Sequence, residues 1–504
     1  MASSRLRSGP VSLRGVLARA KFVRGGDLAV AKCSSDWRDC SPGDLFVALS
    51  TEGGDGHDHA PEAIARGAVG VLAERLVPVD APVVLVKDTR EALARITQAL
   101  AGHPCRQLRS IGVTGTAGKT VTAMLLASIF EKAGEAVGVV SSIGYSDSLT
   151  QAPPRQATPT TEQLADWLGR MAAAGCESAV LELSSRALAE RRAAGLELDA
   201  AVITNIRREH FDLHNTPQAY LRAKRRVFSL LKEGGVAVIN ADDHRCRNLL
   251  SSLPAPCLTY GLHAEADISA TVIERHKSEQ TFVLAAGSDS IPVRSRMIGD
   301  HHVSNCLAAA AAGLSLGLDL TTIVQGLEAI DHVPGRLERL ECGQPFGVFV
   351  DAAAAPETLA LSIKAVRRVT AGRVIVVAGC PASGDRSVRP LVGRVLERSA
   401  CLPILTANDP RHEEPLAIVH DLLDGFERPH QAHVLPDRAE AIRYALSQAR
   451  EGDSVLITGK GDRQGQILGS RRMPHDDRGV ARLWLYERGA DELGGGGPRL
   501  RIVR

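Results

Sequence analysis

Short apolar, β-branched runs alternate with amphipathic stretches along most of the chain. Buried strands are predicted at 110–114, 179–183, 201–205, 236–240, 347–351, 374–378 and 454–458. Between several of them, apolar residues recur at helical spacing, which predicts helices over 161–175, 217–231 and 356–370. Strands that alternate with helices are typical of α/β proteins with mostly parallel sheets, whose ligand sites gather where the strands end. The pattern therefore predicts an α/β fold.

Length and chain punctuation predict three domains. The chain has 504 residues, and a domain usually takes roughly 100 to 200. Breaks are expected just before the glycine-rich segment near residue 107 and at Val333-Pro334-Gly335. The predicted domains are 1–106, 107–334 and 335–488, and a glycine-rich tail at 489–504 is expected to be disordered.

Charge and cysteine usage exclude several classes of protein. The 60 Lys and Arg residues nearly balance 58 Asp and Glu residues, so the basic excess of a nucleic-acid-binding protein is missing. The chain contains no run of 18 apolar residues, so no membrane span is predicted. The basic segment 5–24 lacks the apolar stretch of a secretory signal and is expected to begin the first domain. Ten dispersed cysteines suggest neither a disulfide framework nor a zinc site, so a reducing cytoplasm is expected.

A glycine-rich turn follows the first strong strand. Residues 115–120 read Gly-Thr-Ala-Gly-Lys-Thr, between an apolar strand ending at Val113 and an apolar helix. Glycines let backbone N–H groups turn toward a phosphate, and the helix start adds its positive end. Lysine at 119 can reach the β and γ phosphates, and threonine at 120 can ligate Mg²⁺. Although the strict spacing would require glycine at 113, the combination of strand, turn and helix predicts a nucleotide-binding loop.

This loop and the segments around it resemble the Mur ligase family over about residues 36–481. Asp36-Trp37-Arg38, the segment 42–49 and Asp55-Gly56-His57 are similar to a uridine-nucleotide-binding segment of that family. Folylpolyglutamate synthetases share the ATP domain but lack this segment, so the resemblance is closest to the branch that adds diaminopimelate or lysine. It implies a UDP-sugar-binding domain, a central P-loop ATP domain on a mostly parallel sheet, and a Rossmann-like amino-acid-binding domain.

The resemblance implies a catalytic set in the central domain. Glu182 matches a Mg²⁺-binding glutamate, and His210 lies in the segment that carries the family's second metal-binding histidine. Lys224 matches a lysine that the family carbamylates, which turns a cation into an anionic oxygen ligand. The implied catalytic residues are Lys119, Glu182, His210 and Lys224. The implied magnesium ligands are Thr120, Glu182, His210 and Lys224.

By the same resemblance, nucleotide and substrates have contacts in all three domains. The implied ATP contacts are Gly115, Thr116, Gly118, Lys119, Thr120, Asn305, Arg336 and Asp351. The implied substrate contacts are Asp36, Arg38, Thr158, Ser184, Ser185, Arg389, Asn408, Asp409, Arg411 and Gly459. Arginine at 411 suits bidentate recognition of a carboxylate, so meso-diaminopimelate is favoured over lysine.

The implied reaction is ATP-dependent amide formation through an acyl phosphate, with ATP and Mg²⁺ as cofactors. The γ phosphate passes to a carboxylate of UDP-N-acetylmuramoyl-L-alanyl-D-glutamate, and the amine of a diamino acid then displaces phosphate. The expected partners are these small molecules, with no nucleic acid. A monomeric, cytoplasmic enzyme of peptidoglycan precursor synthesis is expected.

Several positions depart from the family pattern and leave two hypotheses open. The replaced positions include Trp37, Ala117, Val121, Ala157, Arg186, His301, His302, Ala354 and Arg463. The alanine run 352–355 stands where the family has a tyrosine and a histidine. Arg463 stands where it has a glutamate near the substrate's ammonium group, which a cation would repel. The chain is therefore either a working ligase with shifted substrate preference, or a weakened paralogue that binds nucleotide or UDP-sugar in regulation or assembly.

Overall fold

In the computed structural model of the chain, the described residues are 9–51, 53–207, 214, 216–253 and 255–492. Internal contacts group the chain into two compact units. The first unit comprises residues 1–206, 218–260 and 308–326, and the second comprises 207–217, 261–307 and 327–504. Among the described residues, no helix combines the length and apolar character needed to cross a bilayer.

The first unit contains a small sheet formed by residues near the amino terminus. Its order is β2-β9-β8-β5-β4, with β2 antiparallel to four parallel strands. The bounds are Lys21–Val23, Val83–Leu85, Gly70–Ala73, Leu45–Val47 and Cys33–Ser34. Phe46 packs in one apolar cluster, whereas Leu45 and Val47 pack in another with Ile96 of α3 (Thr89–Leu100). Because successive side chains of a strand point to opposite faces, both faces of this sheet are covered.

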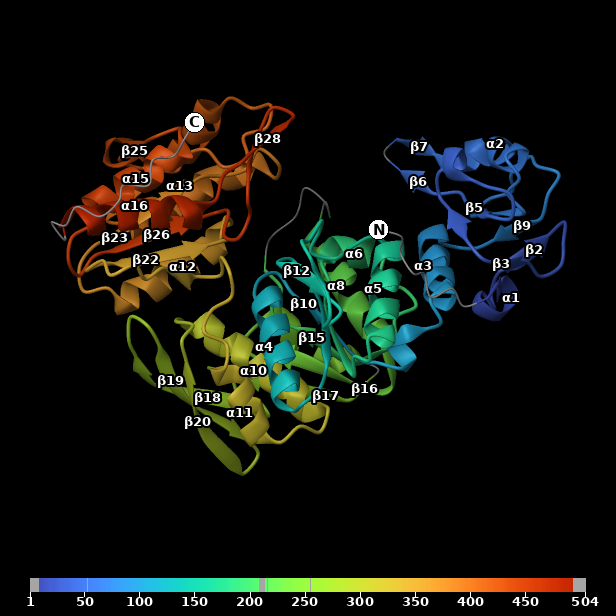
Figure 1. The fold of residues 1–504 in the computed structure, drawn as a ribbon, viewed down its shortest axis with the longest axis horizontal. Coiled ribbons are helices and arrows are strands. Elements are labelled where there is room, and N and C mark those ends of the chain that lie inside the picture. Colours follow the sequence, from blue (N-terminus) through green and yellow to red (C-terminus); the bar gives the residue numbers. More distant parts are fainter. Residues whose placement is uncertain (1–8, 52, 208–213, 215, 254, 493–504) are drawn as a thin grey trace. The chain divides into compact units, whose positions relative to one another are not determined.

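A larger group of sheet strands in the first unit includes β10, which leads into the predicted nucleotide loop before α4 (Figure 1). Strands β11, β14, β10, β15, β16 and β17 run parallel in that order, and β12 and β13 extend the β11 edge as antiparallel strands. In the same order, the bounds are Val137–Ser141, Ser178–Glu182, Arg109–Thr114, Leu198–Ile203, Leu231–Asn240, Cys257–Gly261, Gly144–Ser146 and Gln151–Ala152. The parallel α/β class predicted from the alternating pattern is confirmed.

The helices of this unit differ from their predicted bounds mainly at their ends. Helix α4 spans Lys119–Lys132, and α5 spans Thr161–Ala173 within the predicted 161–175. The helix predicted over 217–231 is α-helical only over Pro217–Arg225 (α8) and continues as a tighter 3-10 segment to Leu230. Helices often tighten in this way in their last turn. Strand β15 ends at Ile203, two residues before the predicted end, so Thr204 and Asn205 belong to the following loop.

The second unit contains three antiparallel strands and a mostly parallel sheet. The antiparallel strands are β18 (Ile268–Arg275), β19 (Gln280–Ala286) and β20 (Asp289–Ser295). The mostly parallel sheet has the order β21-β22-β26-β23-β24-β25, with only β21 antiparallel to its neighbour. Its bounds are Glu338–Arg339, Gly347–Asp351, Ser454–Thr458, Val374–Ala378, Leu402–Leu405 and His433–Val434. The three strands predicted here match β22, β23 and β26 residue for residue.

Helices cover both faces of this mostly parallel sheet. On one face, α12, α13 and α14 pack with alternate strand residues such as Val376, and on the other α15 and α16 pack with Val377. The helix bounds are Pro356–Val369, Arg389–Ser399, Pro415–Leu423, Arg438–Gln448 and Asp477–Glu492. Strands covered on both faces need apolar residues at every position, which explains their continuous apolar runs in the sequence.

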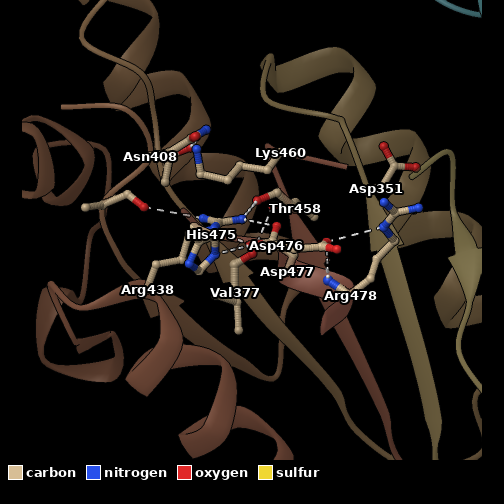
Figure 2. A network of polar contacts seen from close by, with 12 residues as sticks. Asp351, Val377, Asn408, Arg438, Thr458, Lys460, His475, Asp476, Asp477 and Arg478 are labelled. Atoms are coloured by element: carbon tan, nitrogen blue, oxygen red, sulfur yellow. Dashed lines mark hydrogen bonds and ion pairs between the residues drawn. The ribbon is translucent and has the colours of Figure 1, made fainter. Parts of the chain in front are cut away.

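A buried ion pair joins the starts of α15 and α16. The guanidinium of Arg438 donates to both carboxylate oxygens of Asp477 at 2.7 Å, and the two side chains are 1% and 0% exposed. Arg438 also donates to the carbonyl of Thr458 at 2.7 Å, and His475 Nε2 lies 2.8 Å from Asp477 Oδ1 (Figure 2). These contacts satisfy a charge pair that burial would otherwise make costly.

Two adjacent histidines open helix α10 (Asp300–Ser315). The rings of His301 and His302 have centroids 4.3 Å apart. Burial lowers the pKa of His301 to about 4 and holds the pKa of His302 well below its usual range. Asp300 opposes the shift at His301, and Arg207 adds to it. Both rings are therefore neutral in the folded protein near pH 7.

We predict that Arg438→Met lowers the free energy of unfolding by about 3–5 kcal/mol, because it leaves the Asp477 carboxylate buried without its partner. Unfolding in denaturant, followed by a signal that reports on the second unit, measures this loss of free energy. Arg443→Met, an exposed position on the same helix, should change stability by less than about 0.5 kcal/mol. The double variant Arg438→Met/Asp477→Leu should recover part of the loss; equal losses in single and double variants would contradict this account.

We also predict that acid destabilises the protein through the two histidines. Their pKa values are lower in the folded state than the ordinary histidine pKa of 6.5. The unfolded chain therefore takes up protons at these histidines first, as the pH falls below 6.5. The stabilising contribution is complete above pH 6.5 and is lost as the pH falls toward 4. Unfolding measured over this range should show a weaker pH dependence in His302→Phe than in wild type. The exposed His430→Phe should leave the dependence unchanged; an unchanged slope in His302→Phe would refute the assignment.

Candidate functional site

The predicted phosphate loop joins the end of β10 to the start of α4 in the first unit. Gly115 and Gly118 have φ values of 152° and 87°, which favour glycine. A Cβ built at Gly115 would lie 1.8 Å from the hydroxyl oxygen of Thr204. The loop therefore lies directly against the segment that follows β15, and a side chain at 115 would prevent this contact.

Asn205 holds the loop in this position. Its backbone carbonyl accepts the Thr116 N–H at 3.0 Å, and its side-chain oxygen accepts the Ala117 N–H at 3.0 Å. Its side-chain nitrogen donates to the Ala117 carbonyl at 3.0 Å, and the Thr204 hydroxyl donates to the same carbonyl at 2.6 Å. Position 117 is thus fixed through its backbone, which explains how alanine is accommodated there.

Lys119 begins α4 and points back over the loop. Its ammonium donates to the carbonyls of Gly115 at 3.1 Å and Thr116 at 3.0 Å. The cation thus lies within the phosphate-binding turn, beside backbone N–H groups of the helix start.

Three oxygen-bearing side chains from three elements meet beside this helix start. Glu182, at the end of β14, is 2% exposed, and its Oε2 accepts the Thr120 hydroxyl at 3.0 Å. The same oxygen accepts the Ser142 N–H at 2.9 Å, and the hydroxyl oxygens of Ser142 and Thr120 lie 2.8 Å apart. A carboxylate with two hydroxyls is a set of hard donors of the kind that Mg²⁺ prefers.

The predicted substrate residues Thr158, Ser184 and Ser185 lie next to Glu182. The Thr158 hydroxyl donates to the Glu182 carbonyl at 2.8 Å and accepts the Ser184 N–H at 2.9 Å. Ser184 caps helix α6 (Ser185–Ala189), so both serines stand at its start. Arg186 pairs with Glu190 at 2.9 Å on the exposed side of this helix.

Lys224 is buried in α8, only 1% exposed, with its ammonium 4.6 Å from the centre of the Tyr220 ring. The Tyr220 hydroxyl lies 2.8 Å from the Thr116 hydroxyl of the phosphate loop. The structure therefore connects Lys224 to the loop through Tyr220. His210 lies outside the described residues. Among those that are described, no cluster of three or more His, Cys, Asp or Glu side chains suitable for a metal occurs.

Asp36 and Arg38 lie in the amino-terminal part of the first unit. The Asp36 carboxylate caps a short 3-10 turn by accepting the Arg38 N–H at 2.9 Å. Both side chains are largely exposed and form an ion pair at 3.3 Å. Their local order comes from this turn, and their role toward a uridine nucleotide stays a prediction.

In the second unit, the predicted ATP residues occupy three different elements. Asn305 lies on α10 and is 6% exposed. Arg336 forms a 2.7 Å ion pair with Asp462. Asp351 ends β22, and its carboxylate accepts the Ala353 N–H at 2.6 Å, while burial raises its pKa. The contact from Ala353 uses only the backbone, so the alanine run keeps this turn after β22.

The residues at 408–411, which are predicted to bind the amino-acid substrate, form a tightly held loop. Asn408 is 2% exposed and donates to the Gly379 carbonyl at 3.2 Å. The Asp409 carboxylate accepts the ammonium of the fully buried Lys460 at 2.7 Å. A Cβ at Gly459 would lie 2.7 Å from the Asn408 amide nitrogen, so glycine leaves room for this loop.

The two predicted substrate arginines differ in their surroundings. Arg389 is 3% exposed and donates to Glu413 at 2.8 Å and to Asp421 at 2.7 Å. Arg411 is exposed and has a φ of 51°. Arg389 is thus already neutralised by two carboxylates, whereas Arg411 presents its side chain to solvent.

Three contributors to these sites were not among the predicted residues: Ser142, Asn205 and Lys460. Ser142 and Asn205 follow strands of the parallel sheet, so the general placement of ligand sites at strand ends was the available signal. Lys460 was visible only as part of a Gly-Lys-Gly segment, and its ion pair with Asp409 depends on tertiary structure.

Sequence comparison finds three domains of one family in succession along the chain. Residues 32–100 match "Mur ligase family, catalytic domain", residues 113–313 match "Mur ligase middle domain", and residues 335–461 match "Mur ligase, glutamate ligase domain". The UDP-N-acetylmuramoyl-L-alanyl-D-glutamate--2,6-diaminopimelate ligase of Geobacillus kaustophilus is 39% identical over 472 residues, 92% of this chain and 96% of that protein. The UDP-N-acetylmuramyl-tripeptide synthetase of a Roseiflexus species is 38% identical over 480 residues, 90% of this chain and 94% of that one.

Solved structures show the same architecture. A UDP-N-acetylmuramoyl-L-alanyl-D-glutamate--2,6-diaminopimelate ligase has a TM-score of 0.68 and 29% identity, covering 95% of this chain and 99% of that one. The MurF ligase of Thermotoga maritima in complex with ADP shares the fold, with a TM-score of 0.60 and 21% identity over 92% of this chain and 98% of its own. The matched domains, the relatives and the phosphate loop with its strand-end residues agree: this chain belongs to the Mur ligase family.

Proposed function

We propose that the chain is an ATP-dependent amide ligase that adds a diamino acid, meso-diaminopimelate by preference, to UDP-N-acetylmuramoyl-L-alanyl-D-glutamate. The observation that carries this proposal is the meeting of Lys119, Thr120 and Glu182 at the start of α4. Similarity over nine-tenths of the chain to ligases named for this reaction supports the choice of substrates.

The phosphates of ATP would bind at the turn 115–118. Gly115, Thr116 and Gly118 supply a backbone that can turn N–H groups toward a phosphate. Lys119 now donates to two loop carbonyls, and we propose that it transfers these hydrogen bonds to phosphate oxygens when ATP is bound. Asn305, Arg336 and Asp351 are further residues proposed to contact ATP.

The residues at the end of β14 fit Mg²⁺. The buried Glu182 carboxylate accepts the Ser142 N–H and the Thr120 hydroxyl, and the Ser142 hydroxyl oxygen lies beside that of Thr120. Thr120 and Glu182 would hold the ion, with His210 and a carbamylated Lys224 as the further proposed ligands. When bound, Mg²⁺ would neutralise charge on the transferring phosphoryl group.

The proposed reaction has two steps. A carboxylate oxygen of the UDP-sugar dipeptide attacks the γ phosphorus, the bond to the β-phosphate oxygen breaks, and ADP leaves. The amine of the diamino acid then attacks the acyl carbon, phosphate leaves, and the amine loses a proton as the amide forms. Asp36, Arg38, Thr158, Ser184 and Ser185 are the proposed contacts of the UDP-sugar dipeptide. Arg389, Asn408, Asp409, Arg411 and Gly459 are those of the diamino acid.

The intact surroundings of the loop favour a working ligase over a paralogue that only binds. Ala117 is held by Asn205 through its backbone, and the turn after Asp351 keeps its backbone hydrogen bond despite the alanine run. The replacements at Ala117 and in the alanine run 352–355 therefore leave the local backbone hydrogen bonds in place.

We predict that phosphate release from ATP requires the UDP-sugar dipeptide and one amino acid, and that Lys119→Ala lowers it by about a thousandfold or more, because charge on the transferring phosphoryl group is no longer offset. A coupled phosphate assay measures the rate. Glu182→Gln should raise the Mg²⁺ concentration needed for half-maximal binding of ADP, measured by calorimetry. The exposed Lys364→Ala should behave as wild type; release that survives Lys119→Ala would refute the proposal.

We further predict that Asn205→Ala weakens ATP binding about tenfold or more, because the turn at 116–117 loses two side-chain hydrogen bonds of roughly 1 kcal/mol each. Equilibrium binding of a fluorescent ATP analogue reports this change. Asn248→Ala, at an exposed position, provides the matched control. Equal affinities of the two variants would show that the loop does not depend on Asn205.

A further inference from the structure

An irregular segment connects β13 to α5 and carries Thr158. Residues 153–160 belong to no helix or strand, and residues 153–157 are wholly or partly exposed. Thr158, by contrast, is 1% exposed, and its hydroxyl is held between the Glu182 carbonyl and the Ser184 N–H. Surface segments are more mobile than the elements that they connect unless other contacts hold them. The placement of Thr158 therefore depends on what holds the exposed residues before it.

Tyr145 provides such a contact two residues before Thr158. Its hydroxyl accepts the Gln156 N–H at 3.1 Å and donates to the carbonyl of the same residue. One side chain thus satisfies both backbone polar groups of Gln156. Burial raises the pKa of Tyr145, so the hydroxyl keeps the proton that it donates.

The core of the first unit fixes the Tyr145 ring. Tyr145 is the middle residue of β12, where it lies opposite Val140 of β11 and Ala152 of β13. It is 4% exposed, and its ring meets the ring of Trp167 on α5 edge-on, with the centroids 5.7 Å apart. Because the ring packs on both a strand pair and a helix, its hydroxyl is held at one place beside Gln156.

Arg192 contacts the same segment through its guanidinium. It donates to the side-chain oxygen of Gln156 and, at 3.2 Å, to the carbonyl of Thr158. The carboxylate of Glu190 accepts the Arg192 Nε–H at 2.7 Å and so orients the guanidinium. Gln156 is therefore held through its backbone by Tyr145 and through its side chain by Arg192.

Other contacts hold the proposed metal ligand. The Glu182 carboxylate accepts the Ser142 N–H and the Thr120 hydroxyl, and the Glu182 backbone belongs to β14. Loosening of residues 153–157 should therefore displace Thr158 without displacing the residues around the phosphate loop.

Resting on the proposed function, we propose that Tyr145 is a positioning residue for the UDP-sugar dipeptide. Its hydroxyl holds Gln156, so that Thr158 is in place before the substrate arrives. The substrate then meets a segment that is already ordered, and its binding energy is not spent on ordering that segment. Tyr145 thus acts on substrate affinity through Gln156 and Thr158.

Tyr145→Phe tests this role, because it keeps the ring beside Trp167 and removes only the hydroxyl. In the phosphate-release assay with ATP, Mg²⁺ and meso-diaminopimelate, we expect KM for UDP-N-acetylmuramoyl-L-alanyl-D-glutamate to rise about tenfold, since two hydrogen bonds are lost. Because the bound substrate orders the segment again, kcat should fall less than about threefold, and KM for ATP should change less than about twofold. Tyr486→Phe, at a 63%-exposed position, makes the same change outside this network and should behave as wild type.

Amide hydrogen exchange gives a second measurement that needs no activity. The Gln156 N–H loses its acceptor in Tyr145→Phe, so we expect it to exchange at least about tenfold faster than in wild type. Helix α4 should exchange at the wild-type rate, because its contacts are unchanged. Addition of the UDP-sugar dipeptide should slow exchange at Gln156 again.

An unchanged KM for the UDP-sugar dipeptide in Tyr145→Phe would overturn the inference while leaving the proposed function standing. So would equal rises of KM for the dipeptide and for ATP, because the hydroxyl would then support the fold in general. If the wild type releases no phosphate with any amine, the proposed function fails, and calorimetric binding of the dipeptide decides the role of Tyr145 separately. Binding about tenfold weaker in Tyr145→Phe than in Tyr486→Phe would support the inference; equal binding, or no binding by the wild type, would refute it.

Discussion

The nucleotide loop depends on the position of β10 between β14 and β15 in the parallel sheet. Parallel strands end at the same edge, so the two neighbours of β10 bring Glu182 and the Thr204-Asn205 pair to the loop that follows it. One neighbour supplies the carboxylate proposed for the metal, and the other fixes the loop backbone. A shift of β14 by one residue would turn the Glu182 side chain to the opposite face of the sheet. The pairing register is thus a condition for the chemistry as well as for the core.

The second unit solves a different physical problem, which is the burial of charge. Arg438 with Asp477, Lys460 with Asp409, and Arg389 with Glu413 and Asp421 place cations in or near the interior, each with a close carboxylate. These pairs occupy the carboxylates of Asp477, Asp409, Glu413 and Asp421 with internal partners. Which carboxylates are used internally cannot be judged from a net charge of +2 for the whole chain.

The replaced family positions differ in their physical consequences. Alanine at 117 is accommodated because Asn205 binds the backbone there, and a backbone contact is insensitive to the side chain. The alanines at 352–355 keep the turn after β22 through a backbone hydrogen bond. They lack the larger side chains of the family pattern, so any contacts of those side chains are lost. Arg463 places a cation at an exposed position, where the replacement does not disturb a core. These three replacements therefore differ in physical consequence although they look alike as departures from a pattern.

By itself, the sequence predicted the α/β class, the seven buried strands β10, β14, β15, β16, β22, β23 and β26, and the glycine-rich turn between β10 and α4. These features depend on local periodicity and on short glycine spacing, which are properties of neighbouring residues. The residues that hold the two loops, by contrast, lie far along the chain. Asn205 is 88 residues from Ala117 of the phosphate loop, and Lys460 is 51 residues from Asp409 of the 408–411 loop. Contacts across such separations are set by strand order and register, which no local pattern records. Only the tertiary structure decided that Ser142 joins Glu182 and Thr120, and that Arg389 is neutralised internally.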